Sequence, residues 1–151
     1  MDLYPLLKYL HVLLAIVAVG LNVSYAVWLQ RASRAPQPLG HVLATLQFLD
    51  DRLANPAYAL LLATGFGLVW LGPWRLDTFW IAAALVLYGV LVVLGLGGYS
   101  RILRQQLRTL QAEGPATPAY RRLARRATLV GSASLVVALA IVYLMVVKPS
   151  P

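Results

Sequence analysis

The 151-residue sequence has no cysteine, which excludes disulfides, thiolate metal sites and cysteine nucleophiles. Charged residues make up only 12% of the chain, about half of the ~25% usual in a soluble domain. Apolar residues make up 60%, and a soluble fold of this size could not bury so much apolar surface. These shortages exclude an ordinary soluble domain and predict a membrane protein.

Catalytic signatures are also absent, because the sequence has no phosphate-binding loop, nucleophile elbow or dinucleotide-binding fingerprint. The acidic residues are few and all lie outside the long apolar stretches: Asp2, Asp50, Asp51, Asp77 and Glu113. A proton relay through membrane carboxylates is therefore not predicted. Asp50 and Asp51 are interpreted as part of a solvated helix face, with a local polar knot as the alternative.

Four long apolar stretches contain no Asp, Glu, Lys or Arg: Tyr9–Leu29, Pro56–Gly72, Thr78–Gly98 and Ala127–Val147. Each has the ~17–25 residues that a helix needs to cross a membrane. Runs such as Leu91-Val92-Val93-Leu94 do not alternate, which argues against β-barrel strands. The expected fold class is all-α, an integral membrane four-helix bundle forming one domain over residues 1–151. The first stretch is expected to be a retained span and not a signal peptide.

Cytoplasmic helical extensions are expected before the second stretch and after the third. Apolar residues recur at helical spacing over 39–53 and 103–110. Asn55-Pro56 predicts a cap or kink ahead of the second stretch. Gly114-Pro115 predicts a break, and Thr117-Pro118 predicts the start of the next helix.

Basic residues are distributed unequally between the two ends of the expected bundle. Ten of them lie in the segments after the first and third stretches: Arg31, Arg34, Arg52, Arg101, Arg104, Arg108, Arg121, Arg122, Arg125 and Arg126. The positive-inside rule places this end in the cytoplasm and both termini outside the inner membrane. The net charge of +8 is thus interpreted as an orientation signal and not as a nucleic-acid footprint. The arginines are expected to contact anionic lipid head groups.

His11 is the most informative residue, since ionisable side chains within a span are rare and mark function by default. Asn22 and Tyr25 share its helical stripe, on which a flat cofactor could lie. His11 is the candidate metal ligand, and Met145 is the candidate second ligand because His/Met ligation of haem iron is known. The alternative for His11 is a hydrogen bond to a neighbouring helix.

His41 is not expected to assist His11, because the two lie about one bilayer core apart. It is predicted to be a surface or capping residue. Two histidines without a buried carboxylate do not make a hydrolytic zinc site.

Small residues predict close helix packing. They form two stripes and one glycine-rich segment: Ala59, Ala63 and Gly67; Gly131, Ser134 and Ala138; and Gly89, Gly95, Gly97 and Gly98. A gap for a ligand or an exchangeable partner is the alternative.

Short motifs at the ends of the stretches carry a resemblance: Leu7-Lys8-Tyr9-Leu10-His11-Val12-Leu13, Asn55-Pro56-Ala57, Gly98-Tyr99 and Val146-Val147-Lys148-Pro149. Over nearly its whole length the chain resembles a family of small four-span bacterial proteins described only as predicted integral membrane proteins. More distantly, it is similar to HemJ-type protoporphyrinogen oxidases and CopD-type copper-resistance membrane domains. The HemJ resemblance implies haem b with His11 as axial ligand.

The sequence departs from the HemJ pattern at the third stretch. HemJ-type proteins carry Trp-x-His-x-Lys there, whereas this chain has Trp80-Ile81-Ala82-Ala83-Ala84. Protoporphyrinogen oxidase activity is therefore not predicted.

Two main functions remain open, and a transporter is a third option that no inverted repeat supports. The preferred one is a non-catalytic membrane protein, either an accessory subunit or a helix-packing module that binds a second copy or a larger membrane complex. The other is a b-type haem-binding, redox-linked protein with His11 as axial ligand. The sequence leaves the substrate, the partner and the oligomeric state open.

Overall fold

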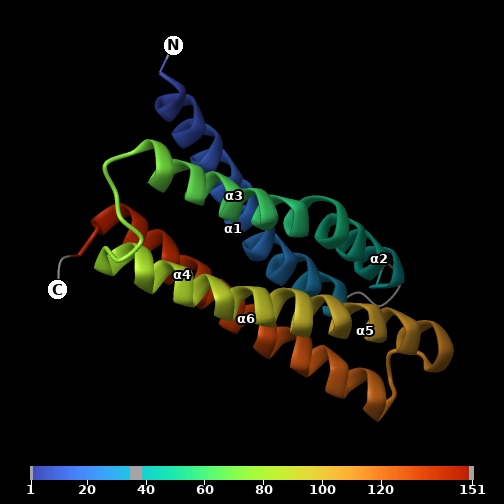
Figure 1. The fold of residues 1–151 in the computed structure, drawn as a ribbon. Coiled ribbons are helices and arrows are strands. Elements are labelled where there is room, and N and C mark those ends of the chain that lie inside the picture. Colours follow the sequence, from blue (N-terminus) through green and yellow to red (C-terminus); the bar gives the residue numbers. More distant parts are fainter. Residues whose placement is uncertain (1, 35–38, 150–151) are drawn as a thin grey trace.

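The computed structural model describes residues 2–34 and 39–149, which are helical except for short connections (Figure 1). The elements in this part of the chain are α1 (Leu3–Arg34), α2 (Leu39–Leu49), η1 (Asp50–Ala54), α3 (Asn55–Leu71), α4 (Phe79–Val92), η2 (Val93–Tyr99), α5 (Ser100–Glu113) and α6 (Pro118–Val147), where η marks a π-helix. Because η1 and η2 continue their neighbours without a break, the elements form four long helices. Each is long and apolar enough to cross a membrane, which confirms the all-α membrane fold class.

The four long helices pack as two pairs, α1 with α3 and α4 with α6, and α1 joins the pairs by packing on α6. Within the described residues, α3 does not pack closely against α4 or η2. The bundle is consequently least tightly closed between these two helices.

Aromatic side chains join the two pairs at one end, which we call the tryptophan end. Trp74 Nε1 donates a hydrogen bond to the Tyr4 hydroxyl over 3.3 Å. The Lys148 ammonium lies 4.5 Å from the Trp74 ring centroid and 5.5 Å from that of Trp80, within range of cation–π attraction. These contacts hold the start of α1, the α3–α4 turn and the end of α6 together.

The α3–α4 turn carries one exposed ion pair. Arg75 donates two hydrogen bonds to the Asp77 carboxylate, over 3.0 and 2.9 Å. These hydrogen bonds lower the pKa of the Asp77 carboxyl group.

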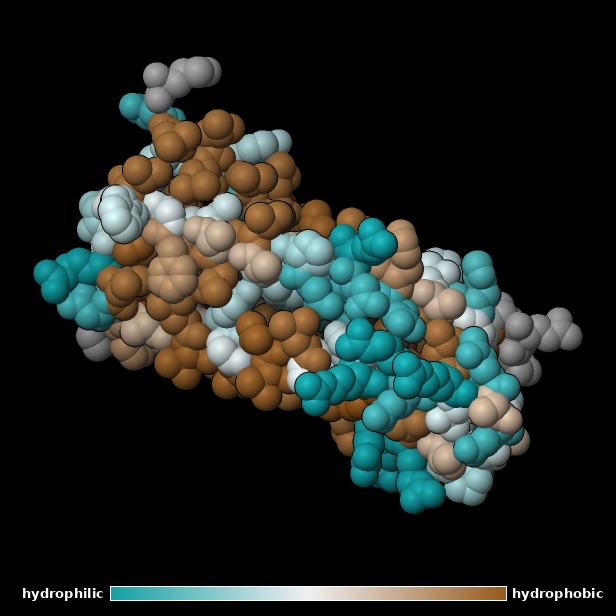
Figure 2. All heavy atoms as spheres, turned by 45° about the vertical axis from the view of Figure 1, so that its right-hand side comes forward, coloured by the Kyte–Doolittle hydropathy of each residue, from teal (hydrophilic) through white to brown (hydrophobic). Residues whose placement is uncertain are grey.

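The opposite end is the arginine end, and Figure 2 shows hydrophilic side chains gathered there. Of the ten arginines that the sequence predicts at this end, nine have exposed side chains: Arg31, Arg52, Arg101, Arg104, Arg108, Arg121, Arg122, Arg125 and Arg126. The tenth, Arg34, is the last residue of α1. Both helical extensions are present, as α2 and α5.

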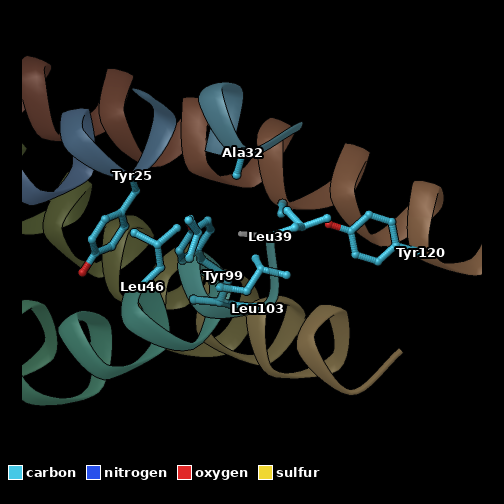
Figure 3. Packing of buried hydrophobic residues seen from close by; sticks show 10 residues of the cluster. Tyr25, Ala32, Leu39, Leu46, Tyr99, Leu103 and Tyr120 are labelled. Atoms are coloured by element: carbon cyan, nitrogen blue, oxygen red, sulfur yellow. The ribbon is translucent and has the colours of Figure 1, made fainter. Parts of the chain in front are cut away.

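The main apolar core lies at this arginine end and not midway along the bundle. Leu43, Leu46 and Leu103 are its most deeply buried large side chains. Figure 3 shows Leu46 and Leu103 beside Tyr99, between helices that are far apart in sequence. The extensions α2 and α5 therefore pack as a soluble protein does.

The rest of the bundle has an apolar outer surface (Figure 2). Large side chains such as Val86, Leu129 and Val146 are more than 60% exposed. This is the arrangement expected of helices that face lipid, because lipid tails solvate such side chains.

The helix boundaries follow local rules. Gly114 ends α5 with a positive φ of 84°, which glycine adopts without steric cost. The Thr117 side chain caps α6 by accepting from the Tyr120 backbone N–H over 3.3 Å. Asn55 is not a cap, because η1 leads directly into α3 and the Asn55 N–H bonds the carbonyl of Asp50, five residues earlier. A kink at Asn55-Pro56 stays a prediction. Pro56 has no N–H to continue the ordinary α-helical pattern.

Candidate functional site: a polar cavity between the helices

His11 lies between α1 and α3. Its Nδ1 is 2.8 Å from Thr64 Oγ1, and a Cβ added at Gly65 would lie only 3.4 Å from the imidazole ring. Thr64 Oγ1 also donates to the Leu60 carbonyl over 2.7 Å, so its single proton is engaged and Nδ1 acts as the donor to it. This is the interhelical hydrogen bond that the sequence offered as the alternative to metal ligation.

Asn22, about three turns further along α1, belongs to a second polar contact. Its Nδ2 donates to the Ala18 carbonyl over 3.2 Å and also to the Tyr58 hydroxyl. Because a carbonyl only accepts, the bond to Ala18 identifies this atom as the amide nitrogen. The Tyr88 hydroxyl donates to the Tyr58 carbonyl over 2.5 Å, so Tyr88 of α4 bridges to α3 where the bundle is least closed.

Tyr25 and Tyr99 stack with ring centroids 6.1 Å apart and an angle of 9° between the rings. Both are nearly fully buried, as is Ser134 of α6. Within the described residues, the buried side-chain polar atoms without a hydrogen-bond partner are Tyr25 OH, Tyr99 OH, Ser134 Oγ and Gln106 Oε1. Such atoms are rare in native proteins, since each costs about 1–3 kcal/mol when unsatisfied.

Asp50 corrects the prediction of a solvated acidic face. Its side chain is only 7% exposed, and its Oδ2 accepts a hydrogen bond from Ser100 Oγ over 2.5 Å. Its neighbour Asp51 is the exposed member and lies 3.5 Å from Arg104. The helix turns by about 100° per residue, so adjacent carboxylates face different surroundings. The chain therefore does hold a carboxylate within the bundle.

These groups surround one cavity of about 180 Å³. Its polar lining residues are Asn22, Tyr25, Asp50, Asn55, Tyr58, Tyr88, Tyr99 and Ser134, which come from all four long helices. Three of the four unpartnered polar atoms belong to them. Ala59 of α3 and Leu96 of η2 also line the cavity and are exposed, so it opens to the surface between these helices.

Both π-helices contribute to the cavity wall. Asp50 and Ala54 come from η1, and Gly95, Leu96 and Tyr99 come from η2. A π-helix within an α-helix is frequently found at functional sites. A Cβ added at Gly95 would have no neighbour within 4 Å, so the absence of a side chain there enlarges the cavity and does not serve close packing.

The predicted site residues are only partly brought together. Asn22 and Tyr25 line the cavity, but His11 lies about 16 Å away from Asn22 along the axis of α1. Met145 is half-buried near the end of α6 and does not line the cavity, and His41 is exposed. His11 and Met145 as haem ligands stay a prediction.

The sequence prediction missed Asp50, Tyr58, Tyr88 and Tyr99. Asp50 is followed directly by Asp51 and Arg52, so the sequence suggests that all three are exposed. The tyrosines resemble ordinary interfacial aromatics. A usable signal was present, because Tyr58 and Tyr88 lie inside the apolar stretches with a hydroxyl that needs a partner.

The small-residue predictions had mixed outcomes. Ser134 and Ala138 are buried, and Gly131 packs on the Tyr99 ring, as close helix packing requires. By contrast, Ala59 and Ala63 are exposed, whereas Gly67 of the same stripe packs closely on α1, since an added Cβ there would lie 2.8 Å from Leu7 Cδ2.

Comparison with known proteins places the chain at the level of a family. No curated protein and no solved structure matches it. The family described as "Predicted integral membrane protein (DUF2269)" matches residues 5–149, nearly the whole chain. The distant resemblance to HemJ-type and CopD-type proteins is not among these matches and stays a prediction. The chain belongs to the DUF2269 family of predicted integral membrane proteins.

Proposed function

We propose that this protein is a non-catalytic accessory subunit of a membrane complex, and that it binds a small polar molecule in the cavity. One observation carries the proposal: Tyr25, Tyr99 and Ser134 place three buried, unpartnered polar atoms in residues that line one cavity. A polar occupant would supply the missing hydrogen bonds, worth about 1–3 kcal/mol for each atom otherwise left unsatisfied.

The size of the cavity supports binding of a small molecule. At about 180 Å³ it slightly exceeds the ~150 Å³ engineered cavity that accommodates benzene. The engineered cavity is lined by apolar side chains and stays dry, whereas the cavity in this protein is lined by hydroxyl, amide and carboxylate groups. Its lining therefore favours a polar occupant of similar size.

A haem-binding function has weaker support from the geometry. The hydrogen bond from His11 Nδ1 to Thr64 is compatible with metal ligation through Nε2, but the His11 ring packs against Gly65, and neither His11 nor Met145 lines the cavity. The cavity itself is far smaller than a haem group and lies well away from His11 along α1.

The first test is a thermal-shift experiment on the full chain in lipid nanodiscs. We use three probes of similar shape: choline, the uncharged 3,3-dimethyl-1-butanol and the anionic 3,3-dimethylbutyrate. At least one is expected to raise the midpoint of unfolding by several degrees, because a ligand that binds only the folded state stabilises it. Gly95→Leu should abolish the shift by filling the cavity.

Gly89→Leu is the matched control. Gly89 also has open space at its Cβ position, but it does not line the cavity, so this variant should respond as the wild type does. If none of the three probes shifts the wild-type midpoint, the proposed function is wrong.

We also propose that the arginine end faces the cytoplasm. The support is the concentration of exposed arginines there, while the tryptophan end carries few basic residues. Since the wild type has no cysteine, single-cysteine variants report the topology without background labelling. In intact cells, a membrane-impermeant maleimide should label Leu76→Cys in the α3–α4 turn but not Gln111→Cys in α5. The reverse pattern would contradict the orientation.

A further inference from the structure

We infer that the occupant of the cavity is a small organic cation with an ammonium group, held by Asp50 and the tyrosine rings. This inference rests on the proposed function and adds the chemical class of the ligand. It depends on the charge of the cavity, on the composition of its wall and on the direction of its opening.

The charge in the cavity lining is negative, with no basic side chain among the lining residues. Asp50 is its buried carboxylate, and among the described side chains no Lys, Arg or His lies within ion-pair distance of it. Arg104, the nearby basic residue, pairs with Asp51 instead. A buried carboxylate is costly unless a cation or several hydrogen bonds compensate it. Ser100 donates a hydrogen bond and the Asn55 side chain lies close enough to contribute a second, but both groups are neutral, and a bound ammonium group would supply the opposite charge.

The cavity wall is rich in tyrosine rings. Tyr25, Tyr58, Tyr88 and Tyr99 all line it, from α1, α3, α4 and η2. Aromatic rings attract cations through the negative charge on their faces, and walls of several rings are a recurring way to bind alkylammonium groups. The apolar atoms of Leu62, Leu91 and Val92 complete the wall and suit methyl or methylene substituents.

The opening of the cavity lies on the apolar side of the bundle. It passes between Ala59 and Leu96, which are exposed on helices that do not pack closely together. A ligand can therefore arrive as a free solute or as the ammonium head group of a lipid. The recognition chemistry is the same in both cases.

The test compares choline with 3,3-dimethyl-1-butanol, which has the same shape without the charge, by calorimetric titration of the protein in phosphatidylglycerol nanodiscs. The wild type should bind choline at least about tenfold more tightly than the neutral isostere, because a charge-assisted contact adds to the same apolar contacts. Asp50→Asn should remove this preference and retain the weaker binding of the neutral probe, which also shows that the variant is folded.

Asp51→Asn is the matched control, since Asp51 is adjacent in sequence but exposed and does not line the cavity. It should keep the preference for choline. A second pair tests the rings if Asp50→Asn fails to fold: Tyr88→Leu should bind choline about fivefold or more weakly than Tyr88→Phe, because both variants lose the hydroxyl bond to Tyr58 and only leucine also removes the ring.

Equal affinity of the wild type for both probes would overturn the cation assignment and leave the proposed function standing. Binding of neither probe, nor of the anionic probe, would overturn the proposed function itself. Repeating the titration with phosphatidylethanolamine in the nanodiscs separates the two sources. Competition with choline identifies a lipid head group as the occupant, and unchanged affinity identifies a free solute.

Discussion

Leu103→Ala is expected to lower the free energy of unfolding by about 2–5 kcal/mol, a range typical of large-to-small changes in a packed core. Leu103 is 0% exposed and lies in the core of the arginine end with Leu43, Leu46 and Tyr99. Truncation would leave a void among side chains from α2, η2 and α5. Denaturant titration followed by circular dichroism in mild micelles would measure the loss.

Leu129→Ala provides the control for this effect. Leu129 is 64% exposed on the outer surface of α6, where lipid or detergent replaces the lost contacts. Leu129→Ala is expected to change the free energy of unfolding by no more than about 0.5 kcal/mol, as substitutions at other exposed positions do. Equal losses for the two variants would show that the arginine end is not packed as described.

Gly72→Ala is expected to cost about 1–3 kcal/mol, in the range of overpacking substitutions. An added Cβ would lie 2.7 Å from the Leu68 carbonyl oxygen and 2.8 Å from Tyr4 Cε2. Either the helix end or the Tyr4–Trp74 contact has to move. The measurement is again denaturant titration, now with tryptophan fluorescence as a second signal from the tryptophan end.

The matched substitution Gly89→Ala should have the opposite sign. Gly89 lies within α4 with no atom within 4 Å of the added Cβ, so alanine removes the conformational cost of a helical glycine. That change is worth about 0.5–1 kcal/mol of added stability. A loss of stability at Gly89, or none at Gly72, would contradict the packing at these two positions.

Most of the fold could be predicted from hydrophobic runs and helix-end residues. Apart from the end residues Gly72 and Thr78, every uncharged stretch lies within a long helix, and the Thr117-Pro118 start is correct because capping is a local property. The extension over α5 was visible because Leu103 and Leu107 repeat at helical spacing. These features depend on nearest neighbours in sequence, which a single sequence contains.

The candidate site could be predicted only in part. Asn22 and Tyr25 were found because they share one helical stripe, but their partners lie on other helices. Asp50 and Asp51 are chemically identical neighbours, and only tertiary contacts, such as that of Asp50 with Ser100 at the start of α5, bury one and leave the other exposed. The identification of His11 as the main polar centre was therefore incomplete, since the larger polar cluster is assembled by tertiary contacts.

The two π-helices determine how far α2 and α5 are rotated about the helix axes relative to the rest of the bundle. Each closes with a backbone bond that spans five residues: Asn55 to Asp50 in η1, and Ser100 to Gly95 in η2. Because a π-helical bond spans one residue more than an α-helical bond, each segment takes up one extra residue in nearly the rotation and rise of an α-helix that is one residue shorter. Removing one residue there would therefore restore ordinary α-helix and keep α2 or α5 in phase with the bundle. Tightening a segment into α-helix without a deletion would instead rotate everything beyond it by about 100°, so these two wide turns set the register between the two halves of the molecule.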